Sequence, residues 1–540
     1  MLKHHTLQDL LFCVQYPGGD AAHVSLPEVL AALSAKVDLT FTQLRPHQRP
    51  AWHAFLVQLA YLALEADDDP TPPADAAGWA ARLRALTASF DDGPWCLVNT
   101  DWQQPAFLQP PCSAGRMGDF KRSADAAQDI DILVTSRHHD EKGGKLPLGT
   151  GGLDTLVYAL VSLQGWSSFL GAGNYSTMRM NGGFSSRPQF RLAYERGSGA
   201  EFHRDLTALL DTRDEMHRFV EDAGGIGSGG APLHKLLWLL PWDEGSLPLA
   251  DVHPFCLEVS RRVRLVDGAD GKLRLLRASS NAMRVAAKEA RGVVLDPWVP
   301  IVKGNDGSKA LTAQARTLGY RSLQALLFDT SQTTLPTLAR PTANERRSRV
   351  GQEATLIAQV LVSGDGGTDG LLVRELTMPP AVRARYATDD ALLGQRSKQF
   401  VELAAAAAGK ALRPALLQFV DGGKDVDWKN RDFAKAVEPW VARYESMIDE
   451  AFFGVLFTTV EQALADTPAQ SHWAKWLAGA AHVQLTQAGD FLPTRDASRL
   501  FAKTRAERML NASLRKQFRG LLDDPAPPPA PASAQETSNA

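Results

Sequence analysis

From residue 381 onward the sequence consists of long helical stretches without strand-like runs, and this change constrains the fold more than any other feature of the chain. Apolar and aromatic residues recur there at helical spacing in four successive segments, which is typical of a four-helix bundle. The aromatic residues are therefore expected to form the core of that bundle. The segments are residues 388–410, residues 432–463, a stretch that starts near residue 471, and residues 497–522.

The ends of these helices carry their own signals. Thr388 is expected to cap the first helix, because Asp389 and Asp390 would then lie at the positive end of its dipole. Pro439 is expected to kink the second helix or to mark its true start. The fourth helix is rich in basic residues, which indicates either a solvated surface or contact with a duplex or an acidic partner.

Residues 1–378 mix short strand-like runs with helices. The sequence therefore predicts an α+β protein, with a large mixed N-terminal domain at 1–378 and the four-helix bundle at 379–522. Residues 523–540 are rich in proline, alanine and serine and are expected to be a disordered tail. In the mixed domain we expect helices at 27–37, 51–66 and 153–170, strands at 255–266 and 271–277, and a hairpin of two apolar runs at 356–363 and 371–376.

Composition limits the classes of function. The formal net charge is −3, so any contact with nucleic acid must be local. The scattered residues Cys13, Cys96, Cys112 and Cys256 show no Cys-x-x-Cys spacing, and neither a metal nor a cofactor is expected. No signal-peptide core or membrane-length apolar run appears near the N-terminus, so we expect a cytoplasmic protein without a membrane partner.

Residues 171–184 form a glycine-rich stretch after an apolar helical segment. Glycines such as Gly171 and Gly173 let another molecule approach the main chain closely. Asn174, Asn181 and above all Arg179 would add hydrogen-bond donors for a phosphate or a base edge. The stretch is thus either a surface that lies against a polyanion or a plain pair of turns. Its spacing matches neither a Walker loop nor a dinucleotide-binding loop.

Residues 135–150 are expected to form a long exposed loop. Thr135, Arg137, Lys142 and Lys145 offer donors that suit nucleic-acid phosphates, although a loop that is merely solvated would look the same. The loop also holds a dense group of metal-type ligands, which would support a metal-dependent nuclease or hydrolase. Adjacent side chains point in different directions, so they would need further ligands from distant parts of the chain to bind one ion. The group is His138, His139 and Asp140.

No catalytic signature is present in the sequence. The nucleophile elbow Gly-x-Ser-x-Gly, the zinc motif His-Glu-x-x-His and the phosphate-loop ending Gly-Lys-Ser/Thr are all missing. An active site assembled from distant residues would leave no such signature. The sequence nevertheless favours a binding protein over an enzyme.

The order of these features resembles the CasA family, the large subunit of the type I-E CRISPR Cascade complex. Residues 107–111 resemble a Phe-Met-Gln segment of that family, and residues 132–135 stand where its long RNA-docking loop begins. The glycine stretch resembles its glycine loop. Residues 298–303 resemble the Trp-Pro segment that leads to its lysine finger, and residues 364–370 stand at the position of its wedge, ahead of the C-terminal bundle.

The resemblance implies a binding subunit rather than an enzyme. Its partners would be guide RNA, target double-stranded DNA, other Cascade subunits and a helicase-nuclease recruited after target binding. It would recognise the short PAM duplex beside the target and help to open it. The resemblance assigns RNA contacts to Thr135, Arg137, Lys142 and Lys145. It assigns DNA contacts to Gly171, Gly173, Asn174, Arg179, Asn181, Thr368 and the finger lysine, which is Lys303 or Lys309.

Two departures from the family pattern weaken parts of this assignment. The expected wedge tip holds Asp365 and Asp369, which repel phosphates, and Thr368 is its one small wedge candidate. The cysteine cluster of some family members is absent, so no zinc is expected. A metal-dependent hydrolase that uses the histidine pair, and a scaffold without a nucleic-acid role, remain as alternatives.

Overall fold

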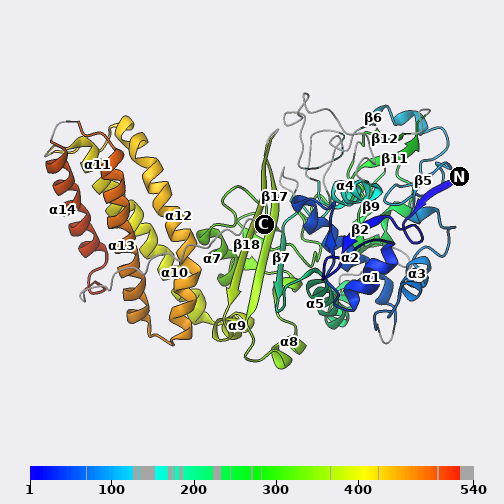
Figure 1. Ribbon diagram of the computed structural model, residues 1–540, viewed down its shortest axis with the longest axis horizontal. Coiled ribbons are helices and arrows are strands. Elements are labelled where there is room, and N and C mark those ends of the chain that lie inside the picture. The colour runs from blue at the N-terminus through cyan, green and yellow to red at the C-terminus, as the bar shows by residue number, and fades with distance from the viewer. Residues whose placement is uncertain are drawn as a thin grey trace. The chain divides into compact units, whose positions relative to one another are not determined.

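In the computed structural model the chain forms two compact units (Figure 1). The first unit comprises Met1–Leu318 and Thr330–Thr377, and the second comprises Gly319–Asp329 and Met378–Ala540. The structure describes residues 1–67, 70–125, 130, 132, 152–167, 173, 177–181, 187–222, 233–243, 245–268, 272–280, 282–364, 367–423, 425–495 and 498–522, without the side chains of 219–222, 363–364 and 367–369. The expected disordered tail at 523–540 lies outside these residues.

The core of the first unit surrounds α2 (Arg49–Leu64), a helix that is apolar on nearly every side and buried along most of its length. Trp52 of α2 stacks on Phe55 with ring centroids 5.5 Å apart and meets Tyr158 edge to face at 5.0 Å. Such aromatic pairs add to the apolar area that they bury. The other helices of this unit are α1 (Leu26–Ser34), α3 (Ala76–Ala85), α4 (Leu153–Gly165), α5 (Ser198–Asp211), α6 (Arg213–Asp222) and α8 (Ala343–Ser348).

The three helices expected in this region are present, and each ends earlier than the sequence suggests. The helix α1 starts with a capping box, in which the backbone N–H of Ser25 donates to Glu28 at 2.6 Å, and Pro27 lies in the first turn. The expected helix at 153–170 ends as α4 at Gly165. Apolar residues such as Val37 and Trp166 follow these helices in the sequence, so periodicity alone does not locate a terminus.

The strands of the first unit form small sheets of two or three strands within the described residues. They pair as β1 (Leu2–His5) with β5 (Cys96–Asn99); β2 (Phe12–Gln15) with β3 (Ala21–Val24) and β4 (Thr40–Phe41); β11 (Arg262–Asp267) with β12 (Leu273–Ala278), which also pairs with β6 (Arg122–Ala124); β17 (Ala354–Gly364) with β7 (Gln189–Ala193) and β18 (Gly367–Met378); β8 (His234–Leu236) with β10 (Val252–Leu257); β9 (Leu247–Pro248) with β13 (Val285–Ala286); and β14 (Ile301–Gly304) with β15 (Gly307–Ala310) and β16 (Thr333–Thr334).

The expected single strand at 255–266 is wrong, because β10 and β11 are separated by a polar break. The buried Gln164 side chain takes the place of a neighbouring strand at this break. Its Oε1 accepts from the backbone N–H groups of Ser260 and Arg261 at 3.0 and 2.9 Å, and its Nε2 donates to the carbonyl of Arg261 at 3.0 Å. One amide side chain thus satisfies backbone groups that would otherwise be buried without partners.

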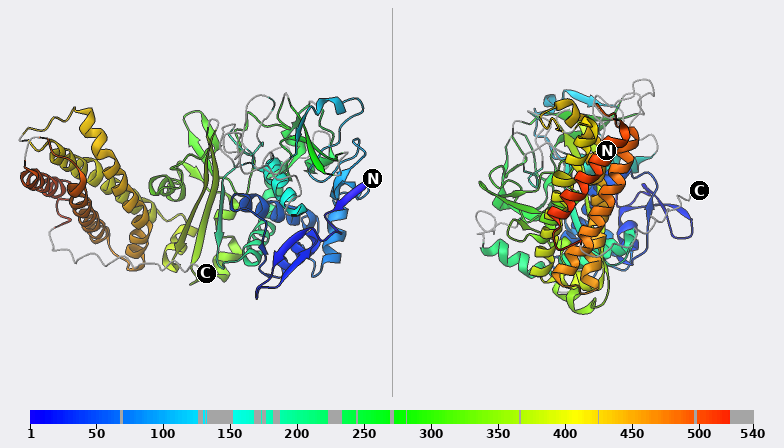
Figure 2. Two further views of the ribbon diagram at one scale, coloured as in Figure 1. Left: turned by 45° about the horizontal axis from the view of Figure 1, so that its top comes forward. Right: turned by 90° about the vertical axis from the view of Figure 1, so that its left-hand side faces the viewer.

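The second unit is a four-helix bundle preceded by shorter helices, as the sequence predicts (Figure 1). In Figure 2 the bundle helices, coloured yellow to red, run alongside one another. In its core Trp473 stacks on Phe400 at 5.5 Å and meets Phe452 edge to face at 6.0 Å. The helices are α7 (Tyr320–Phe328), α9 (Pro380–Ala387), α10 (Ala391–Ala406), a π-helical turn (Ala407–Leu412), α11 (Arg413–Asp421), α12 (Arg431–Glu461), α13 (Asp466–Phe491) and α14 (Arg499–Gln517).

Several expected helix ends in this unit differ from the structure. Asp390, not Thr388, caps α10, and its carboxylate accepts from the backbone N–H of Leu392 at 2.8 Å. The first bundle helix continues past residue 410 to Asp421, because the π-helical turn widens the helix just before Pro414. Proline lacks an N–H and crowds the preceding turn, and the wider turn relieves both problems. Pro439 lies within α12, which continues on both sides of it.

Candidate nucleic-acid interface

The residues 177–181 are fixed by a buried ionic cluster around Arg179, whose side chain is 1% exposed. Its Nε lies 3.0 Å from Oδ2 of Asp296, and its Nη1 pairs with Oε1 of Glu258. Its Nη2 donates to the carbonyl of Cys256 at 3.1 Å. The backbone N–H of Met178 donates to the other oxygen of Glu258 at 2.8 Å. The expectation that Arg179 faces a nucleic acid is therefore wrong, because its donors point into the core.

A second buried arginine shares this cluster. Nη2 of Arg187 lies 2.5 Å from Asp296, and its guanidinium lies 5.0 Å from the ring centroid of Trp166. Burial lowers the pKa of Arg187, and Asp296 opposes part of that effect. Burial alone would also lower the pKa of Arg179, but Glu258, Cys256 and Asp296 raise it above its ordinary value. Both carboxylates are therefore needed to hold two cations in the core.

The cluster supports a neighbouring hairpin through the turn at Arg291 and Gly292. A Cβ at Gly292, where φ is +79°, would lie 2.5 Å from the Cβ of Ala310 and 3.0 Å from the carbonyl oxygen of Arg179. The carbonyl of Arg291 accepts from the backbone N–H of Ala310 at 2.9 Å. Nη1 of the Arg291 side chain donates to the carbonyl of Asp306 at 2.7 Å. The turn therefore braces both the base and the tip of the β14–β15 hairpin.

This hairpin carries the two candidate finger lysines, and both are exposed. Lys303 lies opposite Ser308, and Lys309 lies opposite Val302. Residues directly opposite each other share a face and neighbours along a strand alternate, so the two lysines project from opposite faces of the hairpin. A ligand on one face can thus meet only one of them directly.

Of the expected glycine stretch, the structure describes Gly173 and residues 177–181. Gly173 has φ +80°, and a Cβ there would lie 3.0 Å from the Cβ of Ser279. A side chain at this position would therefore be strained whatever it faced. Asn181 is half-buried, and its Nδ2 donates to Oγ1 of Thr312 at 3.4 Å, so this segment reaches the chain just after β15. Gly171 and Asn174 lie outside the described residues.

The expected apolar hairpin is present as β17 and β18, and its strands extend into the segment predicted as the tip. The strand β17 pairs with β7 from Thr355 opposite Ala193 to Gln359 opposite Gln189, which fixes the base of the hairpin in the first unit. At that base the hydroxyls of Thr355 and Thr377 lie 3.1 Å apart. Thr368 belongs to β18, and its side chain lies outside the described set.

The expected RNA-binding loop also lies outside the described residues. This applies to Thr135, Arg137, Lys142 and Lys145, and to the metal-type group His138, His139 and Asp140. In the part of the chain that the structure does describe, no three His, Cys, Asp or Glu side chains gather as metal ligands. The four cysteines are free thiols, and burial raises the pKa of Cys256 to about 11, so that thiol is not a reactive nucleophile.

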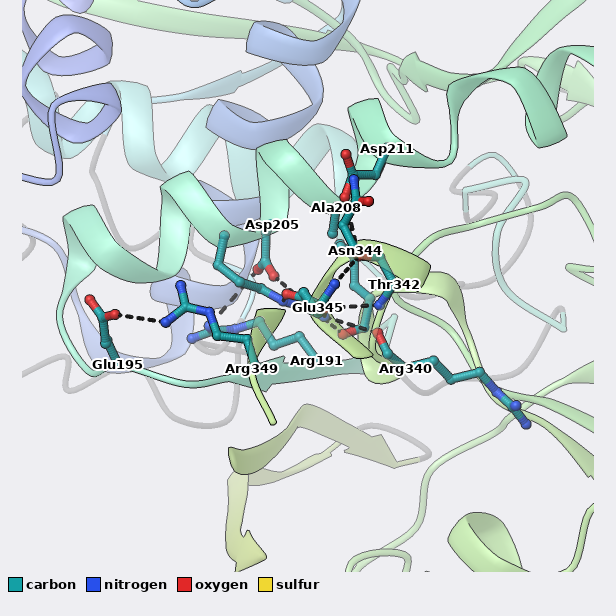
Figure 3. Close-up of polar contacts among 12 residues, drawn as sticks. Arg191, Glu195, Asp205, Ala208, Asp211, Arg340, Thr342, Asn344, Glu345 and Arg349 are labelled. Carbon is teal, nitrogen blue, oxygen red and sulfur yellow. Dashed lines mark hydrogen bonds and ion pairs between the residues drawn. The ribbon is translucent and has the colours of Figure 1, made fainter. Parts of the chain in front are cut away.

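Sequence reasoning missed a polar cavity of about 190 Å³ between α5 and α8. Arg204 at its wall donates to both carboxylate oxygens of Glu345, at 2.8 and 3.0 Å, and to the carbonyls of Leu338 and Arg340 at 2.7 and 2.9 Å. Figure 3 shows this network around Glu345, together with the 3.2 Å contact between Arg349 and Glu195. These arginines are held by carboxylates of the protein itself, which fits a role in fastening α8 to α5.

Comparison with known proteins identifies the fold. Cse1 of Thermobifida fusca superposes with a TM-score of 0.63 at 14% identity, over 95% of this chain and 98% of that one. CasA of Thermus thermophilus gives 0.62 at 16% identity, over 95% and 100%. The CRISPR-associated protein Cse1 of Acidimicrobium ferrooxidans gives 0.60 at 15% identity, over 96% and 98%. The chain therefore has the Cse1/CasA fold along nearly its whole length.

No protein-family model and no curated protein sequence matches the chain. Among the described helices, none is both long enough and apolar enough to cross a membrane.

Proposed function

We propose that this chain is the large subunit of a type I-E CRISPR surveillance complex in the cytoplasm. The observation that carries this proposal is the match of both units, in order and over nearly the full length of each chain, to CRISPR-associated Cse1 and CasA structures. Its partners would be guide RNA, target double-stranded DNA and the other subunits of the complex.

In this role the protein reads the short PAM duplex while the guide RNA reads the target by base pairing. The exposed β14–β15 hairpin supports the proposal, because it presents a lysine on a braced two-stranded ribbon. Two antiparallel strands joined by a tight turn make a narrow, rigid element that can carry a donor to a base edge. Gly171, Gly173, Asn174, Asn181, Thr368 and one of the two hairpin lysines remain the proposed DNA contacts.

The chemistry of target destruction would belong to a recruited helicase-nuclease and not to this chain. The proposed subunit binds the PAM, helps to open the adjacent duplex and presents a surface to that enzyme. The RNA contacts proposed for Thr135, Arg137, Lys142 and Lys145 would hold the subunit on the guide.

Reconstitution of the complex with and without this chain tests the proposal. Binding of a target duplex with the correct PAM should weaken at least tenfold without the chain, whereas a duplex with a scrambled PAM should bind poorly in both cases. Cleavage of DNA by the purified chain with a divalent ion would instead favour the metal-dependent hydrolase that uses His138, His139 and Asp140. Equal binding of both duplexes with and without the chain would contradict the proposal.

The β17–β18 hairpin should act as a weak wedge. In the segment that the sequence predicts as its tip, Gly366 and Gly367 supply no bulk and Asp365 and Asp369 repel phosphates, so Thr368 alone would insert. Deletion of the tip is expected to slow strand opening by about tenfold or less, equivalent to ~1.4 kcal/mol. A fluorescent base beside the PAM would report the opening rate.

The control for this deletion is Thr377→Ala at the base of the same hairpin, where the hydroxyl meets Thr355. That change should leave the opening rate unaltered. Complete loss of opening in Thr368→Ala would show that the hairpin is a strong wedge and that the prediction is wrong.

A further inference from the structure

The polar cavity between α5 and α8 also reaches the end of α1. Three basic side chains from three different elements line it: Lys36 lies just past α1, His203 lies on α5, and Arg349 directly follows α8. The cavity volume of about 190 Å³ is many times what one water molecule needs. The cavity therefore has room for a small polar group between these side chains.

The start of α5 is packed against the backbone at Lys36. A Cβ at Gly199, in the first turn of α5, would lie 2.5 Å from the carbonyl oxygen of Val37 and 2.6 Å from the carbonyl carbon of Lys36. The backbone N–H of Gly199 also donates to Oδ1 of Asp38 at 2.9 Å. His203 lies four residues after Gly199 and so on the same face of α5. That face is the one on which Lys36 lies.

Lys36 has a backbone conformation that lysine usually avoids, with φ +60°. It follows α1 at the left-handed position where glycine is common, and its N–H donates to the carbonyl of Leu33 at 3.0 Å. Glycine would adopt this conformation with less strain. Within the described residues the ammonium group of Lys36 has neither a hydrogen bond nor an ion pair, so no contact there accounts for a lysine at this position.

Arg349 has donors that are not used by the fold. Both of its side-chain hydrogen bonds within the described residues use Nη1, which lies 3.2 Å from Oε1 of Glu195 and 3.2 Å from Oε1 of Gln352. Figure 3 shows the contact with Glu195. Glu195 is 56% exposed, and an exposed ion pair of this kind contributes little to stability. An incoming anion can therefore share Arg349 with Glu195 or displace it.

The other two carboxylates that line the cavity do not face this group of basic residues. Glu345 accepts from Nε and Nη2 of Arg204 at 2.8 and 3.0 Å, so its charge is already paired. Asp211 lies eight residues beyond His203, about 12 Å further along α5. The α1 side of the cavity thus has two cations and the single exposed carboxylate of Glu195, which leaves an excess of positive charge there.

The imidazole of His203 is half-buried and has no hydrogen-bond partner among the described residues. Burial lowers its pKa, Lys36 and Arg349 lower it further, and Glu195 opposes them. An anion placed among these groups would raise the pKa of His203, because it stabilises the imidazolium. Binding of the anion and uptake of a proton by His203 would therefore favour each other.

We propose that Lys36, His203 and Arg349 form a binding site for a phosphate group. Their donors reach the cavity from three elements, which suits the several oxygens of a tetrahedral anion better than the two oxygens of a planar carboxylate. The site goes beyond the proposed function and does not depend on it. The phosphate group is carried either by a small molecule or by a nucleic-acid chain, and the experiment distinguishes these two sources.

The full-length chain is titrated by calorimetry with sulfate, with inorganic phosphate and with a nucleoside monophosphate. All three should bind saturably, and Lys36→Gly should weaken each by about tenfold, since it removes a hydrogen bond from a charged group. Because glycine suits the left-handed conformation, this variant should resist urea at least as well as the unaltered chain, which a purely structural lysine would not allow. The control is Lys121→Gln, an exposed lysine elsewhere in the same unit, which should bind as the unaltered chain does.

The pH dependence is measured with sulfate, because phosphate itself gains a proton in the range where histidine titrates. The unaltered chain should bind sulfate about threefold more tightly below the ordinary pKa range of histidine than above it. His203→Gln keeps an N–H donor but cannot take up a proton, so it should lose this difference. The variant also keeps the test valid if Lys36→Gly fails to fold.

Competition with single-stranded RNA identifies the source of the phosphate. If RNA displaces sulfate and Lys36→Gly weakens RNA binding, the phosphate belongs to a nucleic acid. If RNA leaves sulfate in place while inorganic phosphate or the monophosphate displaces it, the ligand is a small molecule. Absence of saturable sulfate and phosphate binding, or equal binding by the unaltered chain, Lys36→Gly and His203→Gln, would overturn the site and leave the proposed function intact.

Discussion

Replacing Asp296 with alanine is expected to lower the free energy of unfolding of the first unit by about 3–5 kcal/mol. The side chain of Asp296 is fully buried and faces two buried guanidiniums, Nε of Arg179 at 3.0 Å and Nη2 of Arg187 at 2.5 Å. Its other oxygen accepts from the backbone N–H of Trp298 at 2.8 Å. Removal of the carboxylate leaves two cations in the core with one remaining carboxylate, Glu258, and an uncompensated buried charge is costly.

Urea denaturation followed by tryptophan fluorescence measures this loss, because Trp298 is buried beside the altered residue. The control is Asp267→Asn, which breaks the pair with Lys3 at the surface of the same unit. That pair is about one third exposed on each side, and such pairs contribute about 0–1 kcal/mol. A loss below about 1 kcal/mol for Asp296→Ala would contradict the view that this cluster holds residues 177–181 in place.

The architecture of the second unit could be predicted because helical periodicity is a local property. Tyr444, Ile448 and Phe452 recur at four-residue spacing, and all three are buried in the bundle. Periodicity does not predict which apolar residues of a helix are exposed. Leu500 and Phe501 continue the apolar pattern of α14 but are 72% and 64% exposed, since apolar residues are common on protein surfaces. The assignment of Gly319–Asp329 to the second unit depends on long-range packing, which periodicity does not report.

The candidate site was less predictable, because its geometry depends on residues distant in sequence. Glycines near Arg179 suggested an exposed donor, yet Glu258 and Asp296 bury it from far along the chain. Nothing in the local sequence marks those two carboxylates as its partners. The β14–β15 hairpin shows the opposite case. The glycines at both ends of its tip, Gly304 and Gly307, mark a tight turn, but the pairing register is needed to place its lysines on different faces.

That register makes Lys303 and Lys309 a matched pair for testing PAM recognition. Lys303→Ala is expected to weaken target binding by about 1–3 kcal/mol if its ammonium group contacts a base edge, and to relax the preference among PAM sequences. Both lysines are exposed and neighbour the same turn, so either alanine should leave the hairpin folded. Lys309→Ala therefore controls for the loss of one positive charge on the opposite face.

A phosphate contact and a base-edge contact are distinguished by measuring affinity for a set of PAM sequences at several salt concentrations. A lysine that touches only phosphate should weaken all sequences equally and reduce the salt slope by about 1, whereas a lysine that touches a base edge should weaken the preferred PAM most. We expect Lys303 to show the second pattern, because it directly follows the Trp298 segment that precedes the finger in the family resemblance. The reverse result would make Lys309 the finger. If neither variant alters PAM preference, the assignment of this hairpin to PAM recognition is wrong, and the first unit must read the duplex through other residues.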